Sequence, residues 1–490
     1  MSRLHPDGLA ALPADVRRPG YNRGALTTGI VHLGIGAFHR AHQAAYTDDA
    51  LNRAFGPWGI CGVSLRSPDT RDALAPQDGL YTVAVRDAGG ERLRVVGSVT
   101  EVLVAPEDGQ AVLERLTRPE VRVVTLTVTE KGYCHDPATG DLNEEHPGIR
   151  HDLTNPQRPE TAPGFLVEAL DRRRRAGVAP FTGLSCDNLP GNGDTLARIL
   201  GRFAALRDPD LGRWVADHVA CPNSMVDRIV PATTDDDRAA VARRLGCEDS
   251  WPVMTEPFTQ WVIEDRFPTG RPAWELEGAE LVSDVHPYET MKLRLLNGSH
   301  STLAYLGYLG GYQTVSDTIA DPAYARLIRE LMDEEVTPTL QVPPGADLGR
   351  YKAALLERFA NPALKHRTWQ IAMDGSQKLP QRLLGTIRDR LAAGASIDRL
   401  ALGVAAWMRY VAGRDENGRP IDVRDPLAER FAGIAARTGL DAASLAPALL
   451  AVREVFGDDL PRTPVFAASV TAALSRLLDQ GARRTVEAMP

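Results

Sequence analysis

The chain has 490 residues, 43% of them apolar and 24% charged, so it can bury large cores without disulfides or a structural metal. Its 56 basic and 64 acidic residues give a formal charge of -8, which argues against a surface built to attract nucleic acid. The five cysteines form no C-x-x-C pair, the N-terminus has no apolar signal segment, and no membrane-length apolar run occurs. We therefore expect a cytoplasmic protein that binds neither nucleic acid nor a membrane.

Short β-rich runs alternate with helical stretches in the first half of the chain. Residues 37–51 have helical periodicity, and residues 81–85 and 93–96 predict a hairpin with Gly89 and Gly90 in its turn. Buried strands that alternate with helices indicate βαβ units and a parallel sheet, which is the α/β class. The strands predicted for that sheet are 30–33, 60–65, 121–128 and 181–186.

Strand signals fade beyond about residue 286, and helical periodicity takes their place. Proline, glycine and aspartate separate the helical stretches, as in the segments 342–345 and 413–418. We therefore expect an α/β domain over residues 1–284 and a mostly α-helical domain over residues 285–490.

A pair of glycines follows the first predicted strand and precedes a helix. In a Rossmann-type domain the first glycine, here Gly34, permits a tight turn, and the second, Gly36, lets a pyrophosphate approach the backbone. The phosphates then lie at the N-terminus of the helix, which begins with Ala37 and Phe38. The third glycine of G-x-G-x-x-G is replaced by His39, so the motif is incomplete. It still predicts a dinucleotide-binding turn.

Two charged residues that follow the second predicted strand influence the choice of dinucleotide. Asp69 can bind the ribose hydroxyls and repel a 2′-phosphate, unless it only caps the loop before Thr70, whereas Arg66 favours a 2′-phosphate. We expect NAD rather than NADP as the cofactor. His39 and His42 are spaced like metal ligands, but no third ligand accompanies them, and we expect no metal site.

Lysine is rare in this chain, which contains five lysines and 51 arginines. A lysine amine, unlike a guanidinium, can lose its proton when burial or a nearby cation lowers its pKa. In a helix with about 100° per residue, Lys292, Asn297 and His300 lie at about 0°, 140° and 80°, on one side. Lys292 can then take an alcohol proton as hydride leaves for NAD⁺, Asn297 can donate to the developing alkoxide, and His300 can bind a neighbouring hydroxyl. The competing interpretation is a surface lysine and a helix-capping asparagine.

Five segments are spread in order along nearly the whole chain: GIGAFHRAHQ (34–43), TEKGYC (129–134), SCDN (185–188), MVDRIVP (225–231) and K-x4-N-x2-H (292–300). Together they resemble the polyol-specific long-chain dehydrogenases, or mannitol dehydrogenase family. The resemblance implies a Rossmann-type N-terminal domain, NAD-dependent and metal-independent oxidation of a CH–OH group, and an active site in the cleft between the two domains. Residues 306–312 and 366–382 look most like the fructuronate reductase (D-mannonate oxidoreductase) branch.

The resemblance also implies roles for individual side chains. Lys292 would be the general acid/base, Asn188 and Asn297 would hold the reacting oxygen, and His300 would orient the substrate. The remaining implied roles are Asp227 near the nicotinamide, Glu130 and Glu289 along the proton path, and Lys378 at the far end of the substrate.

The end of the substrate remote from the reaction decides which sugar is used. Fructose and fructuronate share a ketone beside CH2OH and differ there, with a hydroxymethyl against a carboxylate. A carboxylate is held by arginine or lysine, and the candidates are Arg367, Lys378 and Arg382, unless both arginines only charge a surface helix. Gln370 stands where mannitol 2-dehydrogenases have arginine, which weakens a mannitol assignment.

We therefore expect an enzyme that interconverts D-fructuronate and D-mannonate. The alternatives are a mannitol 2-dehydrogenase or another polyol dehydrogenase and, more remotely, a non-catalytic NAD-binding protein. The expected partner is a small sugar acid or polyol, and the expected assembly is a monomer or small homo-oligomer.

Overall fold

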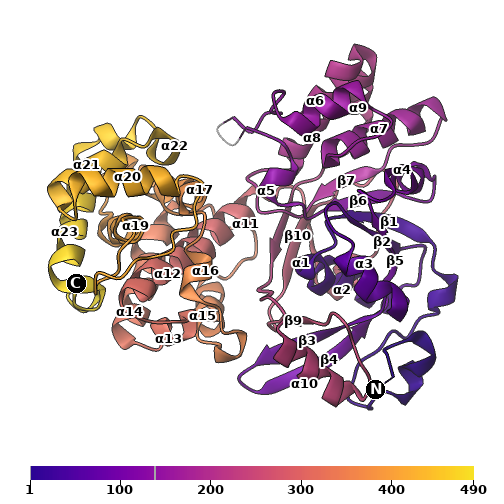
Figure 1. Ribbon diagram of the computed structural model, residues 1–490, viewed down its shortest axis with the longest axis horizontal. Coiled ribbons are helices and arrows are strands. Elements are labelled where there is room, and N and C mark those ends of the chain that lie inside the picture. The colour runs from indigo at the N-terminus through magenta and orange to yellow at the C-terminus, as the bar shows by residue number, and fades with distance from the viewer. Residues whose placement is uncertain (1, 137–138, 490) are drawn as a thin grey trace. The chain divides into compact units, whose positions relative to one another are not determined.

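The computed structural model describes residues 2–136 and 139–489 and separates into two compact units, Met1–His286 and Pro287–Pro490 (Figure 1). The break falls two residues beyond the domain boundary predicted after residue 284. Each unit has its own hydrophobic core. Within the described part of the chain, every helix is too short or too polar to cross a lipid bilayer.

The first unit is built around a five-stranded sheet in which all neighbouring strands are parallel. In spatial order the strands are β5 (Val99–Val104), β2 (Gly59–Ser64), β1 (Thr28–Leu33), β6 (Val123–Leu126) and β7 (Thr182–Ser185). The chain thus fills one side of β1 first and then crosses to the other, which is Rossmann topology. The direction of winding reverses between β1 and β6, and a ligand crevice is expected at their carboxyl ends.

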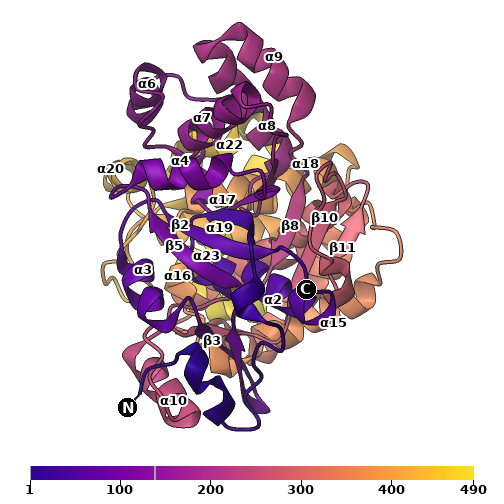
Figure 2. The same ribbon diagram turned by 90° about the vertical axis from the view of Figure 1, so that its right-hand side faces the viewer.

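Apolar side chains cover both faces of this sheet, as parallel sheets between helices require. Val31 and Leu33 belong to the core on one face, whereas Ile30 and Val123 belong to the core on the other. On the first face α4 packs on α7 and α7 on α8 (Figure 2). The helices are α1 (Ala37–Ala41), α2 (Gln43–Arg53), α3 (Asp69–Leu74), α4 (Gly109–Thr117), α5 (Thr129–Gly132), α6 (Pro147–Thr154), α7 (Ala162–Arg175), α8 (Asn192–Arg207), α9 (Pro209–His218) and α10 (Asp235–Leu245).

Two three-stranded sheets complete the first unit. One contains the hairpin predicted from the sequence, and the other joins short strands that the sequence does not predict. The strands are β3 (Tyr81–Asp87), β4 (Gly90–Val96) and β9 (Val253–Thr255) in the first sheet, and β8 (Ser224–Asp227), β10 (Gln260–Glu264) and β11 (Glu280–Val282) in the second.

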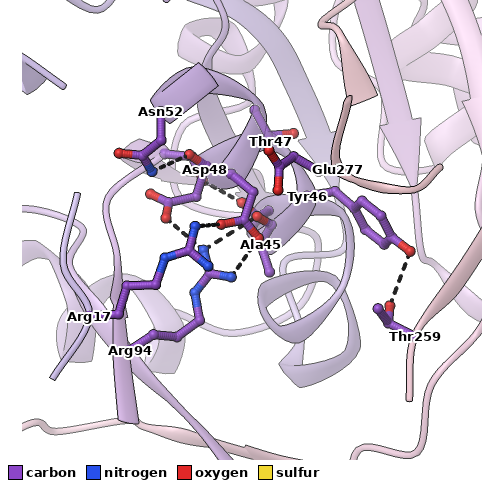
Figure 3. Close-up of polar contacts among 12 residues, drawn as sticks. Arg17, Ala45, Tyr46, Thr47, Asp48, Asn52, Arg94, Thr259 and Glu277 are labelled. Atoms are coloured by element: carbon purple, nitrogen blue, oxygen red, sulfur yellow. Dashed lines mark hydrogen bonds and ion pairs between the residues drawn. The ribbon is translucent and has the colours of Figure 1, made fainter. Parts of the chain in front are cut away.

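A buried carboxylate fastens α2 to the rest of the unit (Figure 3). The Asp48 side chain is 2% exposed and accepts hydrogen bonds from Arg94 Nη2 at 2.7 Å and the Tyr21 hydroxyl at 2.6 Å. The neighbouring Asp49 forms ion pairs with Arg94 and Arg17. Buried charge of this kind is tolerated only when it is paired and hydrogen-bonded. Helix α2, the second helix after the glycine turn, is therefore held in place.

The regular elements described in the second unit are helical. Its central helix is α19 (Asp398–Val411), which is buried on all sides from Leu400 onward and, apart from Arg409, carries almost only apolar side chains there, as expected of a helix surrounded by others. Helices α12 (Ser299–Leu309) and α23 (Pro464–Glu487) pack on it. The other helices are α11 (His286–Met291), α13 (Val315–Ile319), α14 (Pro322–Glu330), α15 (Leu348–Phe359), α16 (Thr368–Ile371), α17 (Gly375–Leu379), α18 (Gly385–Ala392), α20 (Ala428–Thr438), α21 (Ala442–Leu450) and α22 (Arg453–Phe456).

Three stretches of this unit are π-helical: Lys292–Gly298, Leu331–Val336 and Pro380–Leu384. Their hydrogen bonds run from residue i to i+5, a pattern that is rare and often found at functional sites. The regular helix predicted after Pro287 is therefore wrong between Lys292 and Gly298. The first and third stretches pack closely, because a Cβ on Gly298 would lie 2.7 Å from the carbonyl oxygen of Arg382.

Candidate active site

The turn between β1 and α1 requires glycine at its first position. Gly34 has φ = 93°, and a Cβ there would lie 2.2 Å from the carbonyl oxygen of Thr127. Gly36, the N-cap of α1, has φ = -96°, and a Cβ on it would meet only the Gly34 carbonyl oxygen, at 3.8 Å. Protein contacts thus give no reason for glycine at position 36. The open space over it fits the close approach of a pyrophosphate to the helix N-terminus.

A pair of histidine rings replaces the third glycine of the motif. His39 is buried, and its ring stacks on that of His32 with the centroids 3.4 Å apart. His32 is held in turn by the hydroxyls of Thr125 at 2.7 Å and Thr127 at 2.9 Å. Burial keeps the pKa of His32 low, at about 3, so this ring is neutral at pH 7. His39 of α1 and His32 of β1 are therefore in ring contact where the third glycine of the motif would allow close packing of helix and strand.

A cavity of about 320 Å³ opens at the carboxyl ends of β1, β2 and β6, where the topology places a ligand crevice. Its lining includes Gly34, Ser64, Arg66, Thr129 and Thr161. The glycine turn, the cavity and the helix N-terminus together make a site that fits a dinucleotide.

Two of the predicted cofactor residues, Gly34 and Arg66, line this cavity. Phe38 stacks on His42, with ring centroids 5.1 Å apart. Asp69 is exposed and accepts a hydrogen bond from Ser67 Oγ at 2.8 Å; because the N-cap of α3 is Pro68, Asp69 does not cap that helix. The predicted cofactor residues outside the lining are Gly36, Ala37, Phe38 and Asp69.

One important carboxylate at the carboxyl ends of the parallel strands was not among the predicted site residues. Asp187 follows β7 and accepts the backbone N–H groups of Val128 at 2.9 Å and Thr129 at 3.0 Å, and the hydroxyl of Tyr133 at 2.8 Å. Burial raises the pKa of Asp187 to about 6 against the lowering effect of these donors. Its position directly after a buried strand of a parallel sheet is the signal that would have found it.

Three predicted residues of the first unit occupy different environments. Asn188 is exposed in the loop after Asp187, and Glu130 is exposed on the one-turn helix α5. Asp227 is 4% exposed and ends β8, where it pairs in register with Gln260.

In the second unit, the π-helical stretch brings two predicted residues onto one face. Lys292 and Asn297 are five residues apart, and i→i+5 hydrogen bonding places such residues one turn apart along the helix. The angle between these two residues around the helix axis is therefore smaller than the about 140° that a regular α-helix would give. Both side chains are buried, with Lys292 5% and Asn297 8% exposed. Glu289 lies on the preceding helix, α11, and is half-buried.

His300, one turn further along, is enclosed by rings. Its imidazole lies 5.4 Å from the Phe359 ring and 4.8 Å from the His366 ring, centroid to centroid. Nε2 of His300 is buried and has no hydrogen-bond partner among the described residues. Burial, and then the nearby His366 and Arg382, hold the pKa of His300 well below its usual value. A neutral imidazole whose nitrogen has no hydrogen-bond partner among the described residues suits a substrate hydroxyl.

Of the residues predicted for the far end of the substrate, Arg382 and Lys378 are hydrogen-bonded within the unit, whereas Arg367 is exposed. Arg382 donates to Ser301 Oγ at 3.0 Å, and Ser301 is adjacent to His300 in α12. Lys378, one turn before Arg382, donates to the carbonyl oxygen of Met373. Arg367 is exposed at the N-cap of α16.

The histidines considered as metal ligands are engaged elsewhere, His39 in its stack and His42 in a 2.9 Å contact with the Gln260 carbonyl oxygen. Among the described residues, Glu264, Asp284 and His286 have ligand atoms within 4.8 Å of one another. Glu264, however, already binds Asn223 and Arg266.

Comparison with known proteins gives consistent matches along the chain. Residues 28–276 match the family model "Mannitol dehydrogenase Rossmann domain", and residues 284–478 match "Mannitol dehydrogenase C-terminal domain". Two relatives from Escherichia coli are an uncharacterized oxidoreductase, YeiQ, 50% identical over 97% of both chains, and D-mannonate oxidoreductase, 49% identical over 97% of this chain and 98% of the other. Mannitol 2-dehydrogenase from Pseudomonas fluorescens, solved with NAD and D-mannitol, superposes with a TM-score of 0.91 at 44% identity over 99% of both chains.

Proposed function

Because the chain belongs to the mannitol dehydrogenase family, we propose that it interconverts D-fructuronate and D-mannonate with NAD as the hydride carrier. The chain is an oxidoreductase that acts on CH–OH groups of a polyol or sugar acid and uses NAD. The finer choice of substrate is the proposal. The observation that carries the oxidoreductase chemistry is the buried π-helical segment that presents Lys292 and Asn297 on one face, with His300 one turn beyond. The choice of substrate rests instead on the cationic Arg382, which donates to Ser301 beside His300.

The first unit supplies the residues for NAD. Gly34 and Gly36 would admit the pyrophosphate to the N-terminus of α1, and Asp69 and Arg66 would contact the adenosine ribose. When bound, NAD gives or accepts the hydride at the substrate carbon. Asp227 would lie near the nicotinamide.

The second unit supplies the proton. In the reductive direction the Lys292 ammonium would donate a proton to the ketone oxygen as hydride reaches the carbon, and in the oxidative direction the neutral amine would take the hydroxyl proton back. Asn297 and Asn188 would donate hydrogen bonds to the reacting oxygen, which stabilises the charge that develops on it. His300 would bind a neighbouring hydroxyl, and Glu130 and Glu289 would carry the proton to and from solvent.

The preference for a sugar acid rests on the remote end of the substrate. Arg382 lies beside Ser301 and His300, and Lys378 precedes it by one turn. Cationic groups are therefore near His300, the residue that would bind a substrate hydroxyl. A carboxylate gains more from such groups than a hydroxymethyl does. A relative that is 49% identical carries the name D-mannonate oxidoreductase, which also favours the acid. Mannitol 2-dehydrogenase activity is the second candidate, because that enzyme has the similar solved structure.

A panel of substrates with NAD(H) and NADP(H) tests the proposal. Fructuronate, tagaturonate, fructose, mannitol and arabinitol are compared by kcat/KM. We expect fructuronate to exceed fructose by at least about tenfold, which is about 1.4 kcal/mol of discrimination. The reverse order establishes mannitol 2-dehydrogenase, and the absence of turnover by any of the five favours a non-catalytic NAD-binding protein.

A further inference from the structure

The loop after β6 has a backbone conformation that its own residues do not favour. Thr129 has φ = 64° and Cys134 has φ = 52°, both in the left-handed region that non-glycine residues rarely adopt. For a β-branched residue such as Thr129 this conformation is strained. The two positions bracket α5, which carries Glu130. Contacts from outside the loop must therefore maintain its shape.

Asp187 provides those contacts from the neighbouring strand. Its Oδ2 accepts the N–H of Val128 and its Oδ1 accepts the N–H of Thr129, so one carboxylate holds two consecutive peptide groups at the strained position. The Tyr133 hydroxyl, at the other end of α5, donates to the same Oδ2. Tyr133 is 1% exposed, so this end of the loop is anchored in the core. The carboxylate thus holds both ends of the loop by hydrogen bonds.

The main chain of Asp187 is fixed as well. Asn192, at the start of α8, donates from Nδ2 to the carbonyl oxygen of Asp187 at 3.0 Å and to that of Ser224 at 2.8 Å. Ser224 lies in β8, so the loop that contains Asn188 is tied to the neighbouring sheet. Because Asn188 follows Asp187 directly, the same contacts fix the position of its backbone.

We propose that Asp187 is a positioning residue that sets two functional side chains at once, Glu130 through the strained loop and Asn188 through the chain. The inference rests on the proposed function for the roles of those two residues. A carboxylate is required, because only a group with two acceptor oxygens can receive both consecutive N–H groups. An amide of the same shape presents one acceptor and one donor, and the donor opposes an N–H.

The test compares Asp187→Asn with Tyr133→Phe, which removes one donor but leaves both backbone contacts. Steady-state kinetics are measured well below the melting temperature of each variant, together with the Kd of NADH. A double variant, Asp187→Asn with Thr129→Gly, is included because glycine adopts φ = 64° without strain. Hydrogen exchange of the segment 127–134 reports the loop conformation independently of turnover.

We expect Asp187→Asn to lower kcat at least about tenfold, since small misplacements of reacting groups are costly, and to change the NADH Kd and substrate KM by less. Tyr133→Phe should stay within about threefold of wild type. Adding Thr129→Gly should recover part of the lost kcat and of the exchange protection.

The proposal is overturned if Asp187→Asn keeps the kcat and exchange rates of wild type, or if only its melting temperature changes. It is also overturned if Thr129→Gly restores neither activity nor protection. If wild type turns over none of the substrates, the proposed function fails. Hydrogen exchange then still decides whether Asp187 holds the loop.

Discussion

The two units prepare the reaction by different means. In the first unit the proposed cofactor site is made mainly of main chain: a glycine with φ = 93°, a helix N-terminus and the loop after β6 that Asp187 holds. In the second unit the proposed chemistry would depend on side chains carried by a π-helical stretch. The first site should therefore be sensitive to added Cβ atoms, and the second to the identity of the functional groups.

Lys292→Ala is the substitution with the largest expected effect. Loss of the general acid/base should lower kcat by at least about 10²-fold, while the NADH Kd, set by the first unit, changes little. The matched control is Lys352→Ala, because Lys352 pairs with Asp333 on the same unit and is expected to leave kcat unchanged. Partial rescue by an added primary amine would support the proton-transfer role. A variant that keeps kcat but loses NADH affinity would contradict the division between the units.

The two glycines of the first unit should respond differently to alanine. Gly34→Ala introduces a left-handed alanine and a 2.2 Å clash with the Thr127 carbonyl, so it should lower the melting temperature by several degrees, as about 1–3 kcal/mol of strain implies. Gly36→Ala meets no such clash, so it should preserve the melting temperature and weaken NADH binding by about tenfold or more. Thermal unfolding and NADH titration separate the two effects. If Gly36→Ala binds NADH normally, no phosphate lies over that position.

Asp69 should affect the choice of cofactor without affecting the chemistry of the second unit. Asp69→Ala removes a charge that repels the 2′-phosphate, and we expect kcat/KM for NADP to rise by about tenfold relative to NAD. Asp72→Ala is the control, because Asp72 lies on the same helix, α3, and pairs with Arg71. An unchanged cofactor ratio in Asp69→Ala would assign the preference to Arg66 instead.

The sequence predicted the first unit better than the second. Strands β1, β2, β6 and β7 are buried apolar runs, and Gly34 and Gly36 lie directly after one of them, so local pattern was sufficient. Strand β5 was missed because it lies at the sheet edge and the polar residues Thr100 and Glu101 interrupt its apolar run. Strands β8 to β11 were missed because they are only three to five residues long.

The π-helical stretch is a different case, because no residue pattern distinguishes it from an α-helix. It packs closely against Pro380–Leu384, a segment about 90 residues away whose contact the local sequence does not show. His366 and Phe359 were missed for the same reason, since they meet His300 only in the tertiary structure. The predicted roles of Lys292, Asn188 and the other site residues remain predictions.

The smallest expected effect on activity concerns the buried histidine pair of each unit, where the change is in stability toward acid. The folded pKa of His366, about 4, is below the unfolded value of about 6.5, so the unfolded state binds more protons between these pH values. Stability supplied by the neutral ring is thus present above pH 6.5 and falls as the pH falls toward 4, by on the order of 3 kcal/mol at most. In the first unit, His32 has a pKa of about 3 and adds a similar acid sensitivity there.

His366→Gln should therefore flatten the dependence of melting temperature on pH between 4 and 6.5 for the second unit, while the first unit stays acid-sensitive through His32. Calorimetry over this range measures the effect, and His218→Gln, at an exposed histidine of the first unit, is the control. An unchanged slope in His366→Gln would mean that His366 takes up its proton at the same pH in the folded and unfolded states. Below about pH 6.5 it would then place a cation beside His300, the residue proposed to orient a substrate hydroxyl.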